Sequence, residues 1–376
     1  MRIGILTVPF NNNYGGYLQA YALMTILKQM GHEPTIIMRR HTPAPVSLLF
    51  RLKFTIKGIC RTIFYRKRFP LIYSRELTFR TRGRNMLSFV NKYIQPQTIY
   101  IYSTNELRNQ CDGKFDVYIV GSDQVWRPIY VPGIIGNMFL DFTEGWDVKR
   151  FSYAASFGTD NPEYTEDEKQ LCGRLIERFD GVSVREESGA NVIDNLGWHP
   201  KRLSVVLDPT LLLNAIDYNK LLHSSSDSER RVFCYVLDQN PLTDFVVESV
   251  CNVSKLKENV ISNIQTGKSS LPSVEDWLTA IRDAEFVVTD SFHGTVFSII
   301  FNKPFVVCAN TQRGFTRFEA LLATFGLSNR IINKASDLAV LDKDIDWNAV
   351  NRFLLIEQNK SKCFFNEMLN PHLVSE

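Results

Sequence analysis

Residues 285–295 have the sequence Glu-Phe-Val-Val-Thr-Asp-Ser-Phe-His-Gly-Thr, and they indicate the fold class most clearly. The apolar run that ends at Thr289 is typical of a strand covered on both faces, and either Asp290 or Ser291 can cap a following helix. Apolar residues then recur at helical spacing, at Val296, Ile299 and Ile300. A buried strand that leads directly into a helix predicts an α/β fold with a parallel sheet.

The same stretch places His293 in the first turn of the expected helix. Unpaired N–H groups and the dipole at a helix N-terminus attract anions, and Gly294 leaves room for a ligand to approach the backbone. We therefore expect Ser291, Phe292, His293 and Gly294 to contact substrate, with His293 transferring a proton to a phosphorylated compound. The alternative is a histidine bonded to a neighbouring carbonyl group, without a role in chemistry.

Strands alternate with helices in two separate series along the chain. The expected strands are residues 3–8, 35–38, 117–120, 150–154, 181–184 and 203–206, and then 232–237, 259–262, 285–289 and 304–307. This alternation predicts two doubly wound, Rossmann-like α/β domains that face a cleft. We place the boundary at Asp208, which gives domains 1–207 and 208–346, and expect a helix in residues 347–376 to pack back on the first domain.

The composition is that of a large globular protein. The chain has 376 residues, of which 44% are hydrophobic and 22% are charged, which suffices for two domains. No apolar stretch approaches the roughly 18 to 20 residues of a membrane span, and the apolar start of the chain stops at Pro9, as in a first strand. The seven scattered cysteines predict neither a disulfide framework nor a zinc site and favour a cytoplasmic location.

Positive charge is concentrated in residues 39–84. Thirteen Lys and Arg stand there against one acidic residue, so this segment carries +12 and the rest of the chain −9 of the total +3. One helical face is apolar and another basic: the first has Leu48, Leu52, Ile56, Ile59 and Ile63, and the second has Lys53, Lys57 and Arg61. We expect a basic helical insertion at about residues 39–110.

Such a helix can lie on an anionic membrane surface, line a groove for an anionic substrate, or pack on its domain with the basic side in water. No nucleic-acid partner is expected, because the aromatic residues fall among the apolar positions instead of forming a stacking face.

Further candidates follow the other strands, because ligands of doubly wound sheets bind beyond the carboxyl ends of the strands. After the first strand come Asn13, Tyr14, Gly15 and Gly16, which can bond sugar hydroxyls or allow close approach of the backbone. After residues 117–120 come Ser122, Asp123 and Trp126. Asp123 can accept a proton from a hydroxyl and Trp126 can stack on a sugar, whereas the alternative makes them a helix cap and a core residue. Ser156 is expected in the floor of the cleft.

Three arginines are candidates for gripping an anion. Arg185 starts an expected helix, where the dipole disfavours a cation, so its position makes sense if it faces a carboxylate or phosphate. An interdomain salt bridge explains Arg185 as well. Arg313 and Arg317 are further candidates, with an ordinary surface arginine as the alternative for Arg313.

These motifs together resemble the polysaccharide pyruvyl transferase family. The matching stretches, in the order of the family, are residues 12–23, 120–126, 152–158, 183–186, 207–210 and 289–294. The resemblance implies a fold like that of the GT-B glycosyltransferases. It also implies transfer of the enolpyruvyl unit of phosphoenolpyruvate onto two sugar hydroxyls, which forms a pyruvate ketal in cell-surface polysaccharide synthesis. Asp123, Arg185 and His293 match the functional positions of the family.

On this basis we expect His293 to act as the acid and Asp123 as the base, with Arg185, Arg317 and the helix terminus supplying concentrated positive potential for the donor. Phosphoenolpyruvate is then a substrate and no cofactor is expected. No metal site is expected either, because the six histidines are scattered. The expected acceptor is a sugar or a lipid-linked oligosaccharide, reached from the cytoplasm with peripheral membrane contact through residues 39–84. A nucleotide-sugar GT-B glycosyltransferase and a non-catalytic glycan-binding protein are the alternatives.

Overall fold

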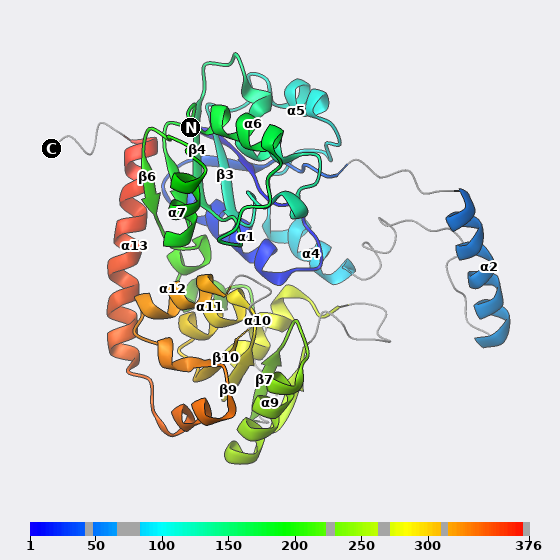
Figure 1. The fold of residues 1–376 in the computed structure, drawn as a ribbon, viewed down its shortest axis with the longest axis vertical. Coiled ribbons are helices and arrows are strands. Elements are labelled where there is room, and N and C mark those ends of the chain that lie inside the picture. Colours follow the sequence, from blue (N-terminus) through cyan, green and yellow to red (C-terminus); the bar gives the residue numbers. More distant parts are fainter. Residues whose placement is uncertain (42–47, 66–82, 223–229, 262–270, 310–314, 371–376) are drawn as a thin grey trace.

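The computed structural model describes residues 1–41, 48–65, 83–222, 230–261, 271–309 and 315–370. Two parallel sheets stand one above the other in Figure 1, each flanked by helices. Both expected series of alternating strands and helices are therefore present.

The first sheet has six parallel strands in the order β2-β1-β3-β4-β5-β6. Their bounds are β1 (Arg2–Leu6), β2 (Glu33–Ile36), β3 (Val117–Asp123), β4 (Lys149–Ala155), β5 (Val182–Val184) and β6 (Leu203–Val205). The helices of this part are α1 (Tyr14–Gln29), α2 (Leu48–Tyr65), α4 (Arg84–Tyr93), α5 (Thr104–Cys111), α6 (Glu166–Ile176) and α7 (Glu187–Asn195).

The second sheet has five parallel strands in the order β11-β10-β9-β7-β8. Their bounds are β7 (Arg231–Tyr235), β8 (Lys257–Val260), β9 (Phe286–Thr289), β10 (Phe305–Cys308) and β11 (Ile331–Ile332). The helices are α8 (Ala215–Asn219), α9 (Pro241–Ser254), α10 (Val274–Arg282), α11 (Phe292–Ile300), α12 (Thr316–Thr324) and α13 (Trp347–Leu369). The strand expected at 259–262 begins earlier, at Lys257, and its last residue lies outside the described chain. The two-residue β11 is too short for a sequence pattern to reveal.

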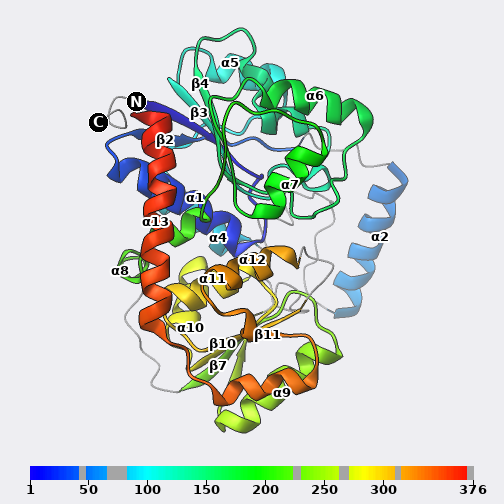
Figure 2. The ribbon, with the colours of Figure 1, turned by 60° about the vertical axis from the view of Figure 1, so that its left-hand side comes forward.

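Helix α13 starts beside the second sheet and runs back to the first sheet, as Figure 2 shows. Its Phe365 ring stacks on Tyr153 of β4, with the centroids 4.2 Å apart. Its Ser361 hydroxyl accepts a hydrogen bond of 2.9 Å from the amide of Leu207, close to the point where the chain leaves the first sheet. The last helix thus braces the connection between the two sheets.

Helices α2 and α4, both within the residues 39–110 that were expected to form a basic insertion, are placed differently. Helix α4 packs on α1, with the rings of Phe89 and Tyr21 5.8 Å apart, and so belongs to the core. Helix α2 instead stands clear of both sheets in Figures 1 and 2, and it confirms the expected helix. Within the described residues, no helix is both long and apolar enough to cross a membrane.

Candidate functional site

The candidate site lies where the two sheets meet, at the N-termini of α11 and α1 and the carboxyl ends of β3 and β5. Thr289 at the end of β9 accepts a hydrogen bond of 3.0 Å from the amide of Ser291, and the Ser291 hydroxyl caps α11 by accepting from the amide of Gly294. Asp290 is not the cap, because its carboxylate accepts from the amides of Leu237 and Asp238 after β7. This turn holds His293 against the first domain.

His293 contacts α1 of the first domain so closely that only glycine fits beneath its ring. A Cβ added to Gly15 would overlap the Nδ1 atom of His293. The His293 side chain is 7% exposed, and its Nε2 lies 3.7 Å from Oδ2 of Asp208, too far for a hydrogen bond. Gly15 therefore serves close packing between the domains, and His293 Nε2 has no hydrogen-bond partner among the described residues.

This packing predicts different outcomes for two neighbouring glycines. We expect Gly15→Ala to displace the His293 ring or the start of α1, with a loss of about 1 to 3 kcal/mol in stability and a lower turnover. Gly16→Ala is the matched control, because a Cβ there meets no atom within 4 Å. In thermal melting, the melting temperature of Gly15→Ala should be well below that of Gly16→Ala. Equal melting temperatures would contradict the close contact.

Arg185 is enclosed by three carboxylates. Its Nη1 lies 3.0 Å from Oδ2 of Asp208 and 3.8 Å from Oδ1 of Asp123, and its Nε lies 3.2 Å from Oε2 of Glu186. Burial by itself would lower the pKa of Arg185, but these carboxylates outweigh burial and raise it above its ordinary value. The remaining nitrogen, Nη2, is buried and has no hydrogen-bond partner among the described residues.

Asp208, which the sequence placed at a domain boundary, is the centre of this cluster. Its side chain is fully buried, and its Oδ2 accepts from the Ser122 hydroxyl and from Arg185, each at 3.0 Å. Oδ1 accepts from the hydroxyl and amide of Thr210. Burial alone would raise the pKa of Asp208, but its contacts with His293 and Arg185 hold it well below the ordinary value. Asp208 thus holds Arg185 by a hydrogen bond and lies next to His293.

Glu186 is a second residue that the sequence did not identify. It is buried, accepts a hydrogen bond from Ser156 and pairs with Arg185. Helix α7 begins only at Glu187, so Arg185 precedes the helix and the argument from the dipole was wrong. Of the three carboxylates around Arg185, Asp123 and Glu186 come from the first domain, whereas Asp208 stands at the expected boundary, so the alternative of an interdomain salt bridge fits the contact with Asp208.

Arg317 of α12 approaches the cluster from the second domain. The guanidinium groups of Arg185 and Arg317 lie 4.2 Å and 5.8 Å from the centroid of the Phe292 ring. Burial and the charge of Arg185 lower the pKa of Arg317 to about 10, partly offset by Glu186 and Asp123. An anion bound between the two guanidinium groups would reduce their repulsion.

Asp123 has a backbone conformation that side chains rarely adopt, with φ of 68° at the end of β3. Such strain in a non-glycine residue persists only where surrounding contacts enforce it, and it is enriched at functional sites. The amide of Ser156 donates a hydrogen bond of 3.0 Å to the Asp123 carbonyl, and this bond fixes the turn. The side chain is 11% exposed, so the turn presents its carboxylate at the junction.

Four other expected contacts have different roles in the structure. Trp126 is fully buried, its indole N–H donates a hydrogen bond of 3.0 Å to the Met138 carbonyl, and its ring stacks on Phe139. The expectation that Trp126 stacks on a sugar was therefore wrong. Tyr14 donates its hydroxyl to the Pro272 carbonyl and stacks on a core tryptophan.

Asn13 caps α1 by accepting from the amide of Gly15. Gly294 is needed because a Cβ would overlap Thr289 Oγ1, so close ligand approach does not explain it. Arg313 lies outside the described residues.

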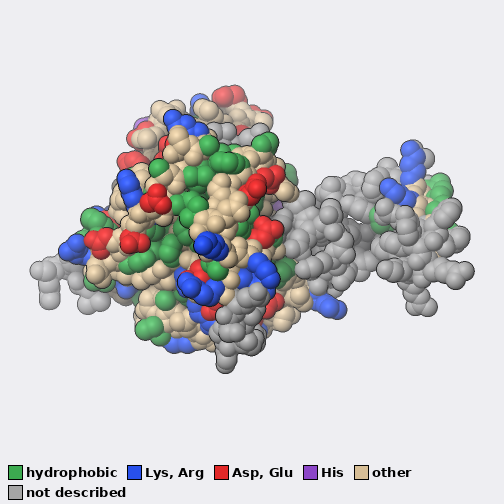
Figure 3. Space-filling model, turned by 90° about the horizontal axis from the view of Figure 1, so that it is seen from below, with side chains coloured by type: hydrophobic (Ala, Val, Ile, Leu, Met, Phe, Trp, Pro, Cys, Tyr) green, Lys and Arg blue, Asp and Glu red, His purple; other side chains and the backbone are tan. Residues whose placement is uncertain are grey.

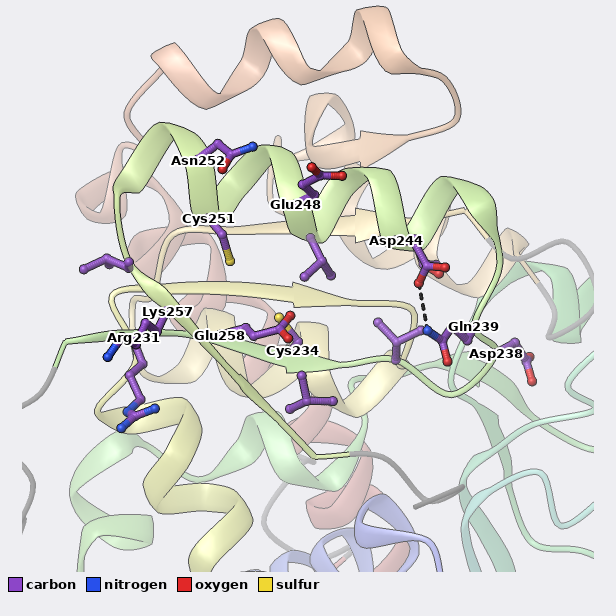
Figure 4. Close-up of a pocket in the computed structure, with 15 residues that line it drawn as sticks. Arg231, Cys234, Asp238, Gln239, Asp244, Glu248, Cys251, Asn252, Lys257 and Glu258 are labelled. Carbon is purple, nitrogen blue, oxygen red and sulfur yellow. Dashed lines mark hydrogen bonds between the residues drawn. The ribbon is translucent and has the colours of Figure 1, made fainter. Parts of the chain in front are cut away.

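A groove of considerable size lies elsewhere, between α9 and the edge strand β8, and Figure 4 shows it. Its volume is about 1020 Å³, with Arg231 and Lys257 at one end and Asp238 and Gln239 at the other. It contains none of the candidate residues. None of its lining side chains is both buried and without a partner, unlike Arg185 and His293. We therefore place the site at the interdomain junction. Among the described residues, no three His, Cys, Asp or Glu side chains are grouped as metal ligands.

A model of one protein family, described as polysaccharide pyruvyl transferase, matches residues 13–312. No curated protein matches the chain. Three solved structures show the same two-domain arrangement at low identity. S. aureus MnaA, solved with UDP, is 12% identical with a TM-score of 0.54, covering 100% of this chain and 98% of its own.

UDP-GlcNAc 2-epimerase of Neisseria meningitidis, bound to UDP-GlcNAc, is 10% identical with a TM-score of 0.50, covering 98% and 94%. The O-GlcNAc transferase of Thermobaculum terrenum is 10% identical with a TM-score of 0.50, covering 98% of this chain and 66% of its own. These similarities confirm the GT-B-like fold.

Proposed function

The chain belongs to the polysaccharide pyruvyl transferase family, and from that premise we propose that it transfers the enolpyruvyl unit of phosphoenolpyruvate onto two hydroxyls of a sugar. The observation that carries the proposal is that two buried side chains beside Asp208 each keep a nitrogen without a hydrogen-bond partner among the described residues, namely Arg185 Nη2 and His293 Nε2. Arg185 contacts Asp208 through its other terminal nitrogen, Nη1, at 3.0 Å, and His293 Nε2 lies 3.7 Å from the same carboxylate oxygen. A donor that carries both a carboxylate and a phosphate ester can interact with both of these nitrogens.

The donor-binding groups come from both domains. Arg185 Nη2 can donate to the carboxylate or phosphate of phosphoenolpyruvate, and the first-turn amides of α11 can donate to a second anionic group. Arg317 adds a second guanidinium across the Phe292 ring. These groups support a donor with two anionic ends.

The cluster is less positive than the sequence indicated. Two guanidinium groups, Arg185 and Arg317, stand against three carboxylates, Asp123, Glu186 and Asp208, so the charges of these five side chains sum to 2 − 3 = −1. As the acid of the proposed reaction, His293 has to carry the proton that it delivers, and this form adds a third cation beside the anionic donor.

The reaction needs one proton on carbon and one leaving group. His293 Nε2 delivers its proton to the methylene carbon of the donor, which leaves a cationic carbon that a sugar hydroxyl attacks while Asp123 accepts the hydroxyl proton. The bond from that carbon to the phosphate oxygen then breaks, and a second hydroxyl of the sugar closes the ketal. Of the two hydroxyl protons, one replaces the proton given to the methyl group and the other leaves with phosphate.

We further propose that this enzyme acts in the synthesis of a cell-surface polysaccharide, with a cytoplasmic active site and a free or lipid-linked saccharide as acceptor. The family supports a saccharide acceptor of this kind.

The direct test is the release of inorganic phosphate. We expect release only when phosphoenolpyruvate and a suitable glycoside are present together, and without an added divalent metal. A panel of glycosides, each assayed with and without a chelator, measures both parts of the prediction. Release from phosphoenolpyruvate alone would contradict transfer, and activity lost to the chelator but restored by magnesium would contradict metal independence. A nucleoside diphosphate formed from a nucleotide sugar would instead identify a glycosyltransferase.

A further inference from the structure

Helix α2 exposes an apolar stripe on its surface. Leu52, Ile56 and Ile59, spaced at i, i+4 and i+7, are 58%, 52% and 44% exposed. Large apolar side chains at this spacing normally face a core, and contiguous exposed ones mark a surface that binds something apolar. Helix α2 stands clear of both sheets, so neither domain covers the stripe (Figures 1 and 2).

All the charged residues of the same helix are basic. Residues 48–65 contain four basic residues and no acidic one, and the wider segment 39–84 carries a net charge of +12. Lys53 and Lys57 follow the stripe at one residue's distance and are exposed. Figure 3 shows blue and green side chains of α2 side by side on the part that projects from the body. Long lysine side chains can extend from an apolar face toward water and anionic headgroups.

We propose that α2 docks this protein on an anionic lipid bilayer, lying in the interface with its stripe among the acyl chains and its lysines at the headgroups. A helix with an apolar face and a cationic face gains both hydrophobic and electrostatic free energy at such a surface. This inference goes beyond the transfer reaction, and it would hold for any soluble or lipid-linked acceptor.

Charge and shape favour a bilayer over the other anionic partners. A nucleic acid would meet Leu52, Ile56 and Ile59, which offer no aromatic plane for base stacking. A small anionic substrate would need enclosure, whereas these side chains are about half exposed. An anionic lipid surface uses the apolar stripe and the basic face at the same time.

The test is co-sedimentation of the full chain with vesicles of phosphatidylglycerol and phosphatidylcholine, without donor or acceptor, so that it stands apart from the transfer reaction. We expect binding to anionic vesicles, weak binding to pure phosphatidylcholine, and weakening by salt. Each lysine contributes about fivefold to the partition coefficient. Lys53→Glu/Lys57→Glu should therefore lower the partition coefficient by about 25-fold or more. Ile56→Ser/Ile59→Ser should lower it by about tenfold or more through the lost apolar contact.

The matched control reverses two exposed lysines far from α2 in sequence, Lys114 and Lys362. Lys114→Glu/Lys362→Glu makes the same change in net charge and should bind nearly as well as the wild type. Equal losses for the two charge reversals would show a general charge effect and overturn the proposal. The proposal would also be overturned if the isoleucine changes left binding to the vesicles unaffected. It would be overturned as well if the protein bound RNA but not vesicles. Circular dichroism of each variant checks that the fold is retained.

Discussion

His293→Ala should lower turnover by about 100 to 10,000 fold while leaving the fold intact. The expected loss is large because His293 Nε2 is buried at the junction and has no hydrogen-bond partner among the described residues, so its proton is available to the donor. The fold should survive because the Arg185 contact with Asp208, at 3.0 Å, does not involve the imidazole. Initial rates over a range of phosphoenolpyruvate concentrations separate a fall in kcat from a rise in KM, and an acid role predicts the former.

His199→Ala is the matched control, since His199 is exposed and lies outside the cluster. Its turnover should equal that of the wild type. Near-normal turnover of His293→Ala would remove this residue from the mechanism. A loss of activity that accompanies unfolding, as judged by circular dichroism and melting in the same buffer, would also contradict the assigned role.

Arg185→Ala should destabilise the protein by about 3 to 5 kcal/mol, because it leaves buried carboxylates without their cation. The contacts of Arg185 with Asp208 and Glu186, at 3.0 Å and 3.2 Å, are the ones lost. Urea denaturation measures this change. Arg202→Ala removes an arginine whose side chain is 59% exposed and should change stability by no more than about 0.5 kcal/mol.

Arg185→Lys separates the structural role from donor binding. Lysine keeps the charge beside Asp208 but loses the planar fork that leaves Nη2 for a ligand. We expect it to retain most of the stability and to raise the KM for phosphoenolpyruvate by about tenfold or more, since a hydrogen bond to a charged group is lost. An unchanged KM in a folded Arg185→Lys protein would show that Arg185 only holds the cluster together.

The sequence predicted the elements of the site better than the contacts between them. Asp123 and Arg185 end parallel strands of one sheet and His293 follows a strand of the other, so the topology alone brings them to facing edges. Their roles in chemistry stay predictions. Which partner each side chain finds depends on contacts between distant residues, and the local pattern carries no information about those.

Asp208 and Trp126 show why the rest was missed. An aspartate before Pro209 has the pattern of a turn or cap, and Asp208 does cap the following turn with one oxygen. Its other oxygen binds Ser122 and Arg185, respectively 86 and 23 residues away along the chain. Trp126 follows a strand end, which predicted exposure, but the turns at residues 128–139 fold back and bury its ring.

The proton that enters the methyl group of the ketal tests the central claim most directly. In heavy water, wild-type protein with phosphoenolpyruvate and an acceptor glycoside should form a pyruvate ketal whose methyl group carries one deuterium, with one phosphate released per ketal. Nuclear magnetic resonance of the product measures both the ketal carbon and the deuterium in the methyl group. A product that keeps the methylene group or the phosphate, or an acceptor that gains a sugar from a nucleotide sugar instead, would contradict ketal formation at this junction.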